Sequence, residues 1–361
     1  MLIGKFLSRK AKYTVIIIIA LVIVKTTADS PSNFLRHLAE KMQRIFQEIT
    51  GPRAYPRGVK VEKQTRFMMD TYVTISAVGA RKITLPAINL ALDRMQEIDV
   101  KFNRLNPKSP LFAFNHQGVA ISDKEIVTVV AAALQVAKDA NALFDITVAP
   151  LIDLWGFNEN EPHLPSQQQI RETLTKVGYE HLSINNGILE KDNPDIAIDL
   201  GGIAKGYAVS EAVKVLKASG ISAALVDAGG DVYAMGKKGR MSWHIGIQAP
   251  RQENLLGYLE IEDLAVMGSG DYERFFMKDG KRYHHILNPK TGCPADELAG
   301  ITVVYPDPML ADAWATALFV LGPKKGMEIV AKIPRMEVMF VDTSDKIIYS
   351  SGLKKILNKI R

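Results

Sequence analysis

The order of apolar and polar residues predicts both strands and helices. In residues 195–200, DIAIDL, apolar residues alternate with other residues, as in a strand with one buried face. After Gly202 the apolar residues recur at helical spacing. Gly201 and Gly202 are therefore expected where a strand becomes a helix, and the N-terminus of a helix attracts anions.

The same two patterns alternate along residues 61–361. We expect helices over residues 85–103 and 122–141, a strand over 67–79, and two strands about a glycine turn over 222–238. These segments follow one another without a fixed repeat period. The sequence therefore predicts an α+β fold in one continuous unit.

A different pattern opens the chain. An apolar run from Tyr13 to Val24 is preceded by four basic residues, Lys5, Arg9, Lys10 and Lys12. No strong cleavage site follows this run. We interpret residues 1–28 as an uncleaved signal-anchor in the cell membrane, with a removed signal peptide as the alternative. Residues 29–60 would be a stalk or linker. The domain over residues 61–361 would then lie on the extracytoplasmic side.

Composition agrees with a folded enzyme. The chain has 361 residues, 47% of them hydrophobic, and a formal net charge of +6. The basic residues are spread along the chain or lie near its N-terminus, so nucleic acid is not an expected partner. The single cysteine, Cys293, excludes an internal disulfide and a cysteine-based zinc site.

The turn after residues 195–200 is a candidate site. It carries Asp199 at the end of the expected strand and Lys205 in the following helix. The spacing matches neither the Walker loop nor G-x-G-x-x-G. From these residues alone, a phosphate or nucleotide site and a sharp turn or close packing at the glycines stay equally open.

Two further acidic stretches have structural explanations. Asp145 precedes the aromatic residues Trp155 and Phe157, which we expect to fill a core. Asp227 and Asp231 flank a double glycine and are interpreted as exposed acids of a hairpin turn.

A histidine pair and a helix complete the candidates. His284 and His285 are consecutive, so they point to opposite faces of a strand, and we expect one to enter a site and the other to lie at the surface. Asp312 and Thr316 are four residues apart, which places their oxygens on one helix face and suits a hard cation. The alternative is an ordinary hydrogen-bonded helix start. We expect both side chains at the helix rim, where their replacement would leave the domain folded.

Taken together, these motifs resemble those of the ApbE family of FAD:protein FMN transferases. The motifs DLGGIAKGYA, DAGGD, SGDYERFF, YHHILNPKTG and ADAWATALFVLG occur in the family's order, from about Thr65 to the C-terminal region. The resemblance implies a fold related to the T-fold. It departs from the family at Leu105, where an aromatic residue is common. It also departs in SPLFAFN, where the serine-arginine pair of the family's SELSRFN-like segment is replaced.

The resemblance assigns roles to individual residues. It implies that Asp199 and Lys205 help to hold FAD and that His285 is the catalytic base. Magnesium would be held by the backbone carbonyl of Gly202 and by the side chains of Asp312 and Thr316. Weaker matches place five residues beside the flavin: Met69, Leu143, Phe144, Asp145 and Ile286.

The activity implied is Mg²⁺-dependent transfer of FMN from FAD to a Ser or Thr hydroxyl of an exported or membrane acceptor protein, with release of AMP. Two alternatives stay open. One is hydrolysis of FAD to FMN and AMP by a pyrophosphatase, and the other is an exported flavin-binding protein without catalysis.

Overall fold

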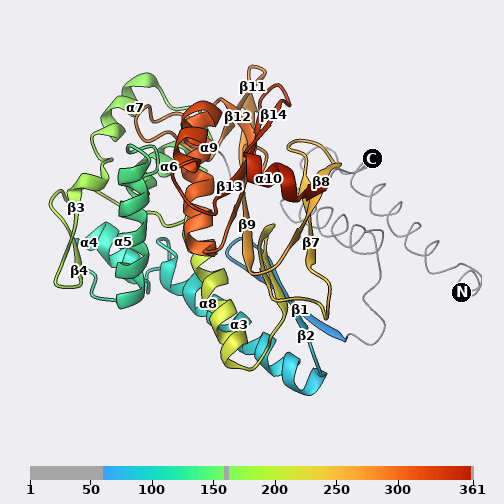
Figure 1. Ribbon diagram of the computed structural model, residues 1–361. Helices are drawn as coiled ribbons and strands as arrows, with labels where there is room; N and C mark the ends of the chain where they lie inside the picture. The colour runs from blue at the N-terminus through green and yellow to red at the C-terminus, as the bar shows by residue number, and fades with distance from the viewer. Residues whose placement is uncertain (1–59, 158–161, 359–361) are drawn as a thin grey trace, which may run out of the picture. The chain divides into compact units, whose positions relative to one another are not determined.

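A computed structural model describes residues 60–157 and 162–358 (Figure 1). The expected signal-anchor over residues 1–28 and nearly all of the expected stalk lie outside these residues. Within the described part of the chain, no helix is long and apolar enough to cross a membrane. The first described strand begins at Val61, where the sequence predicts the start of the domain.

An eight-stranded sheet is the centre of the fold, and each neighbouring pair of its strands is antiparallel. Its strand order is β1-β2-β5-β6-β9-β12-β13-β14. The strands are β1 (Val61–Met68), β2 (Thr71–Val78), β5 (Ala224–Ala228), β6 (Asp231–Met235), β9 (Leu264–Gly270), β12 (Leu298–Tyr305), β13 (Glu337–Asp342) and β14 (Ile347–Tyr349).

Three helices pack against the sheet: α3 (Arg81–Phe102), α8 (Ala204–Ala218) and α9 (Pro308–Val330). A small sheet of β7 (Trp243–Gln248), β8 (Leu255–Ile261) and β15 (Leu357–Asn358), with α10 (Ser351–Ile356), lies near the other face (Figure 1). Successive residues of β9 divide between two cores, since Met267 packs with the helices and Val266 with the small sheet. This alternation is what a sheet covered on both faces requires.

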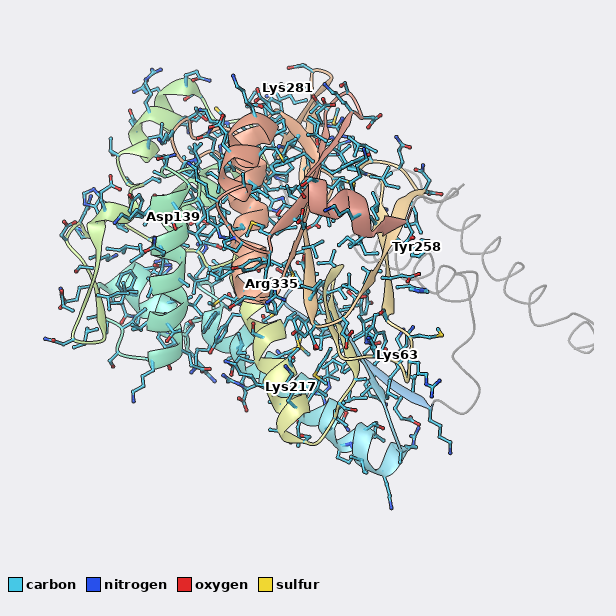
Figure 2. The ribbon with its side chains drawn as sticks, viewed as in Figure 1. Lys63, Asp139, Lys217, Tyr258, Lys281 and Arg335 are labelled. Carbon is cyan, nitrogen blue, oxygen red and sulfur yellow. The ribbon has the colours of Figure 1, made fainter. Side chains whose placement is uncertain are left out.

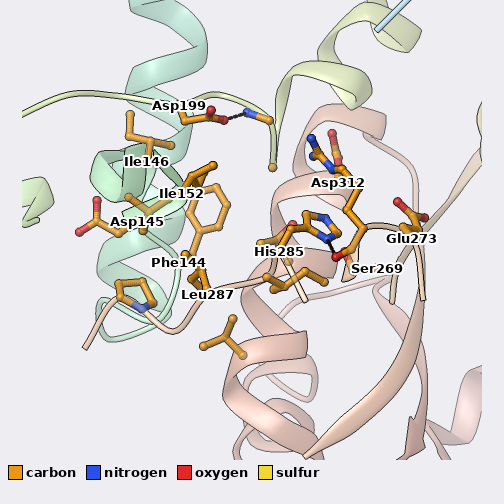
Figure 3. Close-up of a pocket in the computed structure, with 18 of the residues that line it drawn as sticks. Phe144, Asp145, Ile146, Ile152, Asp199, Ser269, Glu273, His285, Leu287 and Asp312 are labelled. Atoms are coloured by element: carbon orange, nitrogen blue, oxygen red, sulfur yellow. Dashed lines mark hydrogen bonds between the residues drawn. The ribbon is translucent and has the colours of Figure 1, made fainter. Parts of the chain in front are cut away.

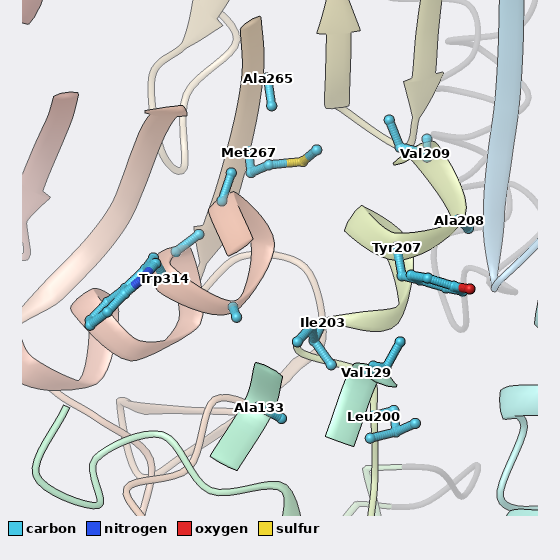
Figure 4. Close-up of a cluster of buried hydrophobic side chains, with 14 of the residues drawn as sticks. Val129, Ala133, Leu200, Ile203, Tyr207, Ala208, Val209, Ala265, Met267 and Trp314 are labelled. Atoms are coloured by element: carbon cyan, nitrogen blue, oxygen red, sulfur yellow. The ribbon is translucent and has the colours of Figure 1, made fainter. Parts of the chain in front are cut away.

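The largest core lies between the helices and the central sheet (Figure 4). Ile203 and Tyr207 at the start of α8 belong to it, together with Met267 of β9 and Trp314 of α9. Helices α8 and α9 approach closely at Gly206, where an added Cβ would lie 2.2 Å from the carbonyl oxygen of Pro308. The start of α8 is thereby held against α9.

Smaller elements surround this core. They are α4 (Pro110–Gln117), α5 (Lys124–Asp139), α6 (Ala149–Trp155), α7 (Gln167–Leu174), the hairpin of β3 (Leu182–Asn185) and β4 (Ile188–Lys191), and the hairpin of β10 (Phe275–Lys278) and β11 (Lys281–His284). Charged side chains such as Asp139 and Lys217 are exposed at the periphery (Figure 2).

Most of the predicted elements are confirmed. Helices α3 and α5 cover the two expected helical segments, α8 begins just after the double glycine, and β5 and β6 form the expected pair. The single strand expected over residues 67–79 is wrong, because Met69 and Asp70 form a turn between β1 and β2. Both residues have the positive φ angles, 52° and 56°, of a tight hairpin turn.

The strand expected over residues 195–200 is also wrong, although its alternation is real. Ile196, Ile198 and Leu200 are buried, but the segment belongs to no sheet. The side chain of Asn115 replaces a neighbouring strand: its Oδ1 accepts from the Ile198 N–H at 2.8 Å and its Nδ2 donates to the Ile198 carbonyl at 2.9 Å. Alternating apolar residues in a sequence indicate that every second side chain is buried. In this segment the side chains are buried although no neighbouring strand pairs with it.

Candidate active site

A pocket of about 130 Å³ lies where the start of α8, the middle of α9 and the end of β9 meet the 3₁₀ turn over Ile146–Val148 and α6. Five segments line it, within residues 143–152, 199–205, 268–274, 285–289 and 312–320. Figure 3 shows Phe144 and Asp199 on one side of this pocket and Asp312, His285 and Glu273 on the other.

The structure brings nearly all predicted site residues to this pocket. Those that line it are Leu143, Phe144, Asp145, Asp199, Gly202, Lys205, His285, Ile286, Asp312 and Thr316. Met69 does not line it; this residue lies in the turn between β1 and β2 and packs against the main core.

Asp312 is buried in the wall of the pocket. Its Oδ2 accepts a hydrogen bond from the backbone N–H of Gly206 at 2.8 Å. Burial, together with the nearby charge of Asp231, raises the pKa of Asp312 to about 7, although the charge of Lys205 opposes the rise. The rim position that the sequence suggests is therefore wrong for Asp312, which is only 3% exposed.

Thr316 lies one helical turn further along α9 and is partly exposed to the pocket. A Cβ added to Gly202 would lie 3.2 Å from the Thr316 Oγ1 and 3.2 Å from the ring of Phe144. The turn before α8 thus reaches the same point of the pocket as the face of α9 that carries Asp312 and Thr316.

Lys205 supplies a fixed positive charge. Its Nζ forms an ion pair with the carboxylate of Asp231, and the Asp231 Oδ1 accepts from the Gly268 N–H at 2.9 Å. Burial lowers the pKa of Lys205, but the charges of Asp231, Glu273 and Asp312 outweigh it, so the pKa is raised overall. Asp231 is buried rather than exposed, which corrects the interpretation of it as a simple turn acid.

Asp145 and Asp199 line the pocket while bonding to the protein itself. Asp145 accepts from the N–H and the hydroxyl of Thr147 and from the Tyr179 N–H, at 2.6 to 2.9 Å. Burial raises the pKa of Asp145. Asp199 accepts from the Gly201 N–H at 2.7 Å and from Arg104. Both carboxylates therefore shape the backbone around the pocket.

His285 faces the pocket with one ring nitrogen already bonded. The His285 Nδ1 lies 3.3 Å from the carbonyl oxygen of Arg274, an acceptor, so the tautomer that makes this bond carries its proton on Nδ1. Desolvation, followed by the charge of Arg274, lowers the pKa of His285 well below its usual value. The ring is neutral at pH 7, and its Nε2 is left with a lone pair.

His284 has a structural role. Its Nε2 donates to the Ala295 carbonyl at 2.6 Å, and its Nδ1 accepts from the Ile286 N–H at 3.3 Å. Its ring packs edge-on against Phe319, with 5.6 Å between ring centroids. The expectation that the second histidine lies at the surface is wrong, because His284 is 3% exposed. Its two bonds to the backbone support the loop that carries His285.

The donor set suits magnesium better than a soft metal. Among the described residues, no group of three His, Cys, Asp or Glu side chains could hold a metal ion. Asp312 and Thr316 instead offer one carboxylate and one hydroxyl, and the carbonyl of Gly202 belongs to the adjoining turn. An all-oxygen set of this kind, completed by substrate oxygens and water, is how Mg²⁺ is usually bound.

Comparison with known proteins gives the family. A sequence model of the ApbE family matches residues 69–340. The chain is 33% identical over 281 residues to a FAD:protein FMN transferase of Vibrio cholerae, a match that covers 74% of this chain and 84% of that protein. The chain belongs to the ApbE family.

Other ApbE proteins agree with this assignment. The Escherichia coli FAD:protein FMN transferase is 36% identical over 214 residues, a match that covers 56% of this chain and 61% of the E. coli protein. The crystal structure of the ApbE protein from Thermotoga maritima covers 83% of this chain and 100% of its own, with a TM-score of 0.78 and 33% identity. The flavin transferase ApbE from Vibrio cholerae has a TM-score of 0.75 at 29% identity, with the same coverage.

Two charged residues at this ApbE-family site are not predicted from the sequence. Arg104 does not line the pocket itself but is bonded to Asp199, which does, and it carries no local signal because its partners are distant in sequence. Glu273 lines the pocket in the loop between β9 and β10. A signal for Glu273 exists, since it lies within the SGDYERFF motif.

Proposed function

We propose that the protein is a Mg²⁺-dependent FAD:protein FMN transferase, which moves FMN from FAD to a Ser or Thr hydroxyl of an acceptor protein and releases AMP. The names of the curated relatives support this proposal. The observation that carries it is the pocket itself, which combines a neutral His285 with the fixed charge of Lys205 and the oxygens of Asp312 and Thr316.

FAD binding follows from the charges and the apolar lining. The pyrophosphate is anionic and would lie near Lys205 and the start of α8, where the helix dipole favours negative charge. Phe144 and Ile286 offer apolar surface to the flavin ring.

Magnesium would be held by Asp312, Thr316 and the carbonyl of Gly202. Its chemistry in such a site is to neutralise the negative charge of the pyrophosphate during transfer. Asp312 is suited to this role because its pKa is already raised to about 7, so a cation beside it relieves the cost of its burial.

In the transfer step, the acceptor hydroxyl oxygen bonds to the FMN-side phosphorus, and the bond from that phosphorus to the bridging oxygen breaks. The hydroxyl proton passes to the Nε2 of His285, and AMP leaves with the bridging oxygen and its electron pair. Lys205 stabilises the charge on the phosphate oxygens. A neutral imidazole near pH 7 is an effective base for this proton.

The test uses the full chain with FAD, magnesium and candidate exported proteins. Transfer gives flavin fluorescence that stays with the acceptor through denaturing electrophoresis, with one AMP released for each flavin attached. AMP release with free FMN, even when an acceptor is present, would show the hydrolase alternative. FAD binding without AMP would show a binding protein.

We also propose that the domain acts outside the cytoplasm, held at the membrane by residues 1–28. The basic and apolar order of those residues supports this. Protease added to cells with a permeable outer envelope should digest the domain. Recovery of the intact protein in the soluble cytoplasmic fraction would contradict the proposal.

A further inference from the structure

Arg104 does not line the pocket; it lies two residues after the end of α3, and its side chain is 6% exposed. Its Nε donates to the Asp199 Oδ2 at 2.6 Å. Its Nη1 and Nη2 donate to the two oxygens of Asp153, in α6, at 3.1 and 2.5 Å. One guanidinium therefore joins three segments that are distant in sequence.

Asp199 connects Arg104 to the turn that lines the pocket. Its Oδ1 accepts from the Gly201 N–H at 2.7 Å, and its own N–H donates to the Ile146 carbonyl at 2.7 Å. Because Arg104 occupies the other carboxylate oxygen, the rotation of the Asp199 side chain is fixed. The start of the turn over residues 201–202 is consequently fixed by a side chain that never enters the pocket.

The turn has little room to move. A Cβ at Gly202 would lie 3.2 Å from both Phe144 and Thr316. A displacement of the turn by a few tenths of an ångström would therefore change the distance between the Gly202 backbone and the Thr316 hydroxyl. These two groups have to share one ion if magnesium is held here.

Arg104 also balances the charge of the pocket. Four carboxylates line it, those of Asp145, Asp199, Glu273 and Asp312, against the two cations Lys205 and Arg274. Burial lowers the pKa of Arg104, but its bonds to Asp153 and the charge of Asp199 raise it overall, so the guanidinium stays charged. An uncompensated Asp199 would repel an anionic pyrophosphate.

We propose that Arg104 is a positioning residue, which acts through Asp199 to hold the turn over residues 201–202 and to make the pocket acceptable to an anionic dinucleotide. This inference rests on the proposed function for its effect on turnover, but not for its effect on FAD binding. The two effects have different causes. Charge governs affinity for FAD, and geometry governs the magnesium requirement and turnover.

The experiment measures the FAD dissociation constant by flavin fluorescence in excess chelator, and then kcat and the magnesium requirement with acceptor. In Arg104→Met, we expect FAD affinity to fall about 10- to 100-fold, because the unpaired Asp199 carboxylate then repels the anionic pyrophosphate at the effective dielectric of a protein surface. In the double variant Arg104→Met/Asp199→Asn, which removes the unpaired carboxylate charge, affinity should return toward that of the native protein while kcat stays low.

Arg104→Lys separates the two causes without leaving Asp199 unpaired. A lysine keeps the charge but cannot donate to both Asp153 and Asp199 in the fixed geometry of a guanidinium. We expect near-native FAD affinity, a raised magnesium requirement and a lowered kcat.

Arg94→Met is the matched control. Arg94 lies on α3, pairs with Glu125 and Glu211, and does not line the pocket. Its loss should lower the melting temperature without changing FAD affinity. The inference is overturned if Arg94→Met and Arg104→Met weaken FAD binding equally, or if Asp199→Asn restores no affinity. Failure of the transferase proposal would look different: no acceptor would be labelled by the native protein, and the affinity pattern would stand.

Discussion

The carboxylate of Asp312 accepts a 2.8 Å hydrogen bond from the backbone N–H of Gly206 and so joins α9 to the first turn of α8. The first turn of a helix has N–H groups without partners inside the helix, and Asp312 satisfies one of them. The same side chain is our proposed magnesium ligand. In this proposal one carboxylate oxygen holds the Gly206 N–H and the other is left for the metal.

Asp312→Ala should remove both the hydrogen bond to Gly206 and the proposed metal ligand. Asp312→Asn should remove chiefly the metal ligand. The alanine variant leaves the Gly206 N–H buried without its partner, which costs about 1–3 kcal/mol in the free energy of unfolding. The asparagine variant can still accept that bond through its amide oxygen but carries no charge for the metal. We expect magnesium-dependent turnover to be lost in both, whereas denaturant unfolding should separate them. Full activity of either variant in excess chelator would exclude the metal site.

Thr316→Ala tests the second oxygen of the proposed site. One hydroxyl is a weaker ligand for magnesium than a carboxylate, so we expect the variant to need more magnesium for half-maximal turnover and to reach a similar maximum. Thr316→Ser keeps the hydroxyl and is the matched control. A titration of turnover against magnesium checks both. Equal magnesium requirements in the alanine and serine variants would remove Thr316 from the ligand set.

His285→Asn should affect chemistry more than binding. The ring of His285 is our proposed base, and loss of a general base costs roughly 10²- to 10⁴-fold in rate. FAD affinity, measured by flavin fluorescence, should stay near that of the native protein. A matching loss of FAD affinity would reassign His285 to substrate binding.

His284→Asn should lower the stability of the fold rather than the rate of transfer, unlike the change at the neighbouring His285. The shorter side chain cannot keep both bonds, from the Ile286 N–H and to the Ala295 carbonyl, and it loses the contact with Phe319. We expect a loss of about 1–3 kcal/mol in the free energy of unfolding. Thermal and denaturant unfolding measure it. If instead the variant unfolds like the native protein and only its transfer rate falls, His284 has a catalytic task.

The sequence predicts the members of the pocket better than their surroundings. The motifs that the chain shares with the ApbE family identify His285, Asp312, Thr316 and Lys205, and all four line the pocket. Each lies in a short contiguous motif, so it can be found from the sequence. Burial of a polar residue has no such pattern. Asp312 and His284 are buried because backbone groups distant in sequence, at Gly206 and Ala295, need hydrogen-bond partners there.

Arg104 shows that ion pairs between distant residues also cannot be predicted from the sequence. Its three bonds go to Asp153 and Asp199, 49 and 95 residues away, so no window of sequence contains the group. The segment over residues 195–200 shows the limit for secondary structure. Its alternation is that of a strand, yet its partner is the side chain of Asn115 rather than another strand.

The pH dependence of transfer should reflect the lowered pKa of His285. A base works when it is unprotonated, and burial, followed by the charge of Arg274, holds the pKa of this ring well below its ordinary value of 6.5. As pH falls from 8, kcat/KM at saturating magnesium should therefore stay level through pH 6.5 and decline only below it. Saturating magnesium is needed because the pKa of Asp312 is raised to about 7, so this carboxyl would otherwise take up a proton in the same pH range. A bound cation favours the ionised carboxylate.

Arg274→Met provides the decisive comparison. Removal of this positive charge lets the ring protonate more easily, so the pKa of His285 should rise and the acid limb of the profile should move toward neutral pH. The backbone carbonyl of Arg274, which lies 3.3 Å from the His285 Nδ1, is retained in the variant, so the orientation of the ring is kept. The control is Lys278→Met, which replaces an exposed lysine at the end of β10, the strand that follows Arg274. This variant should leave the pH profile unchanged. An acid limb that does not move in Arg274→Met would mean that a group other than His285 limits transfer at low pH.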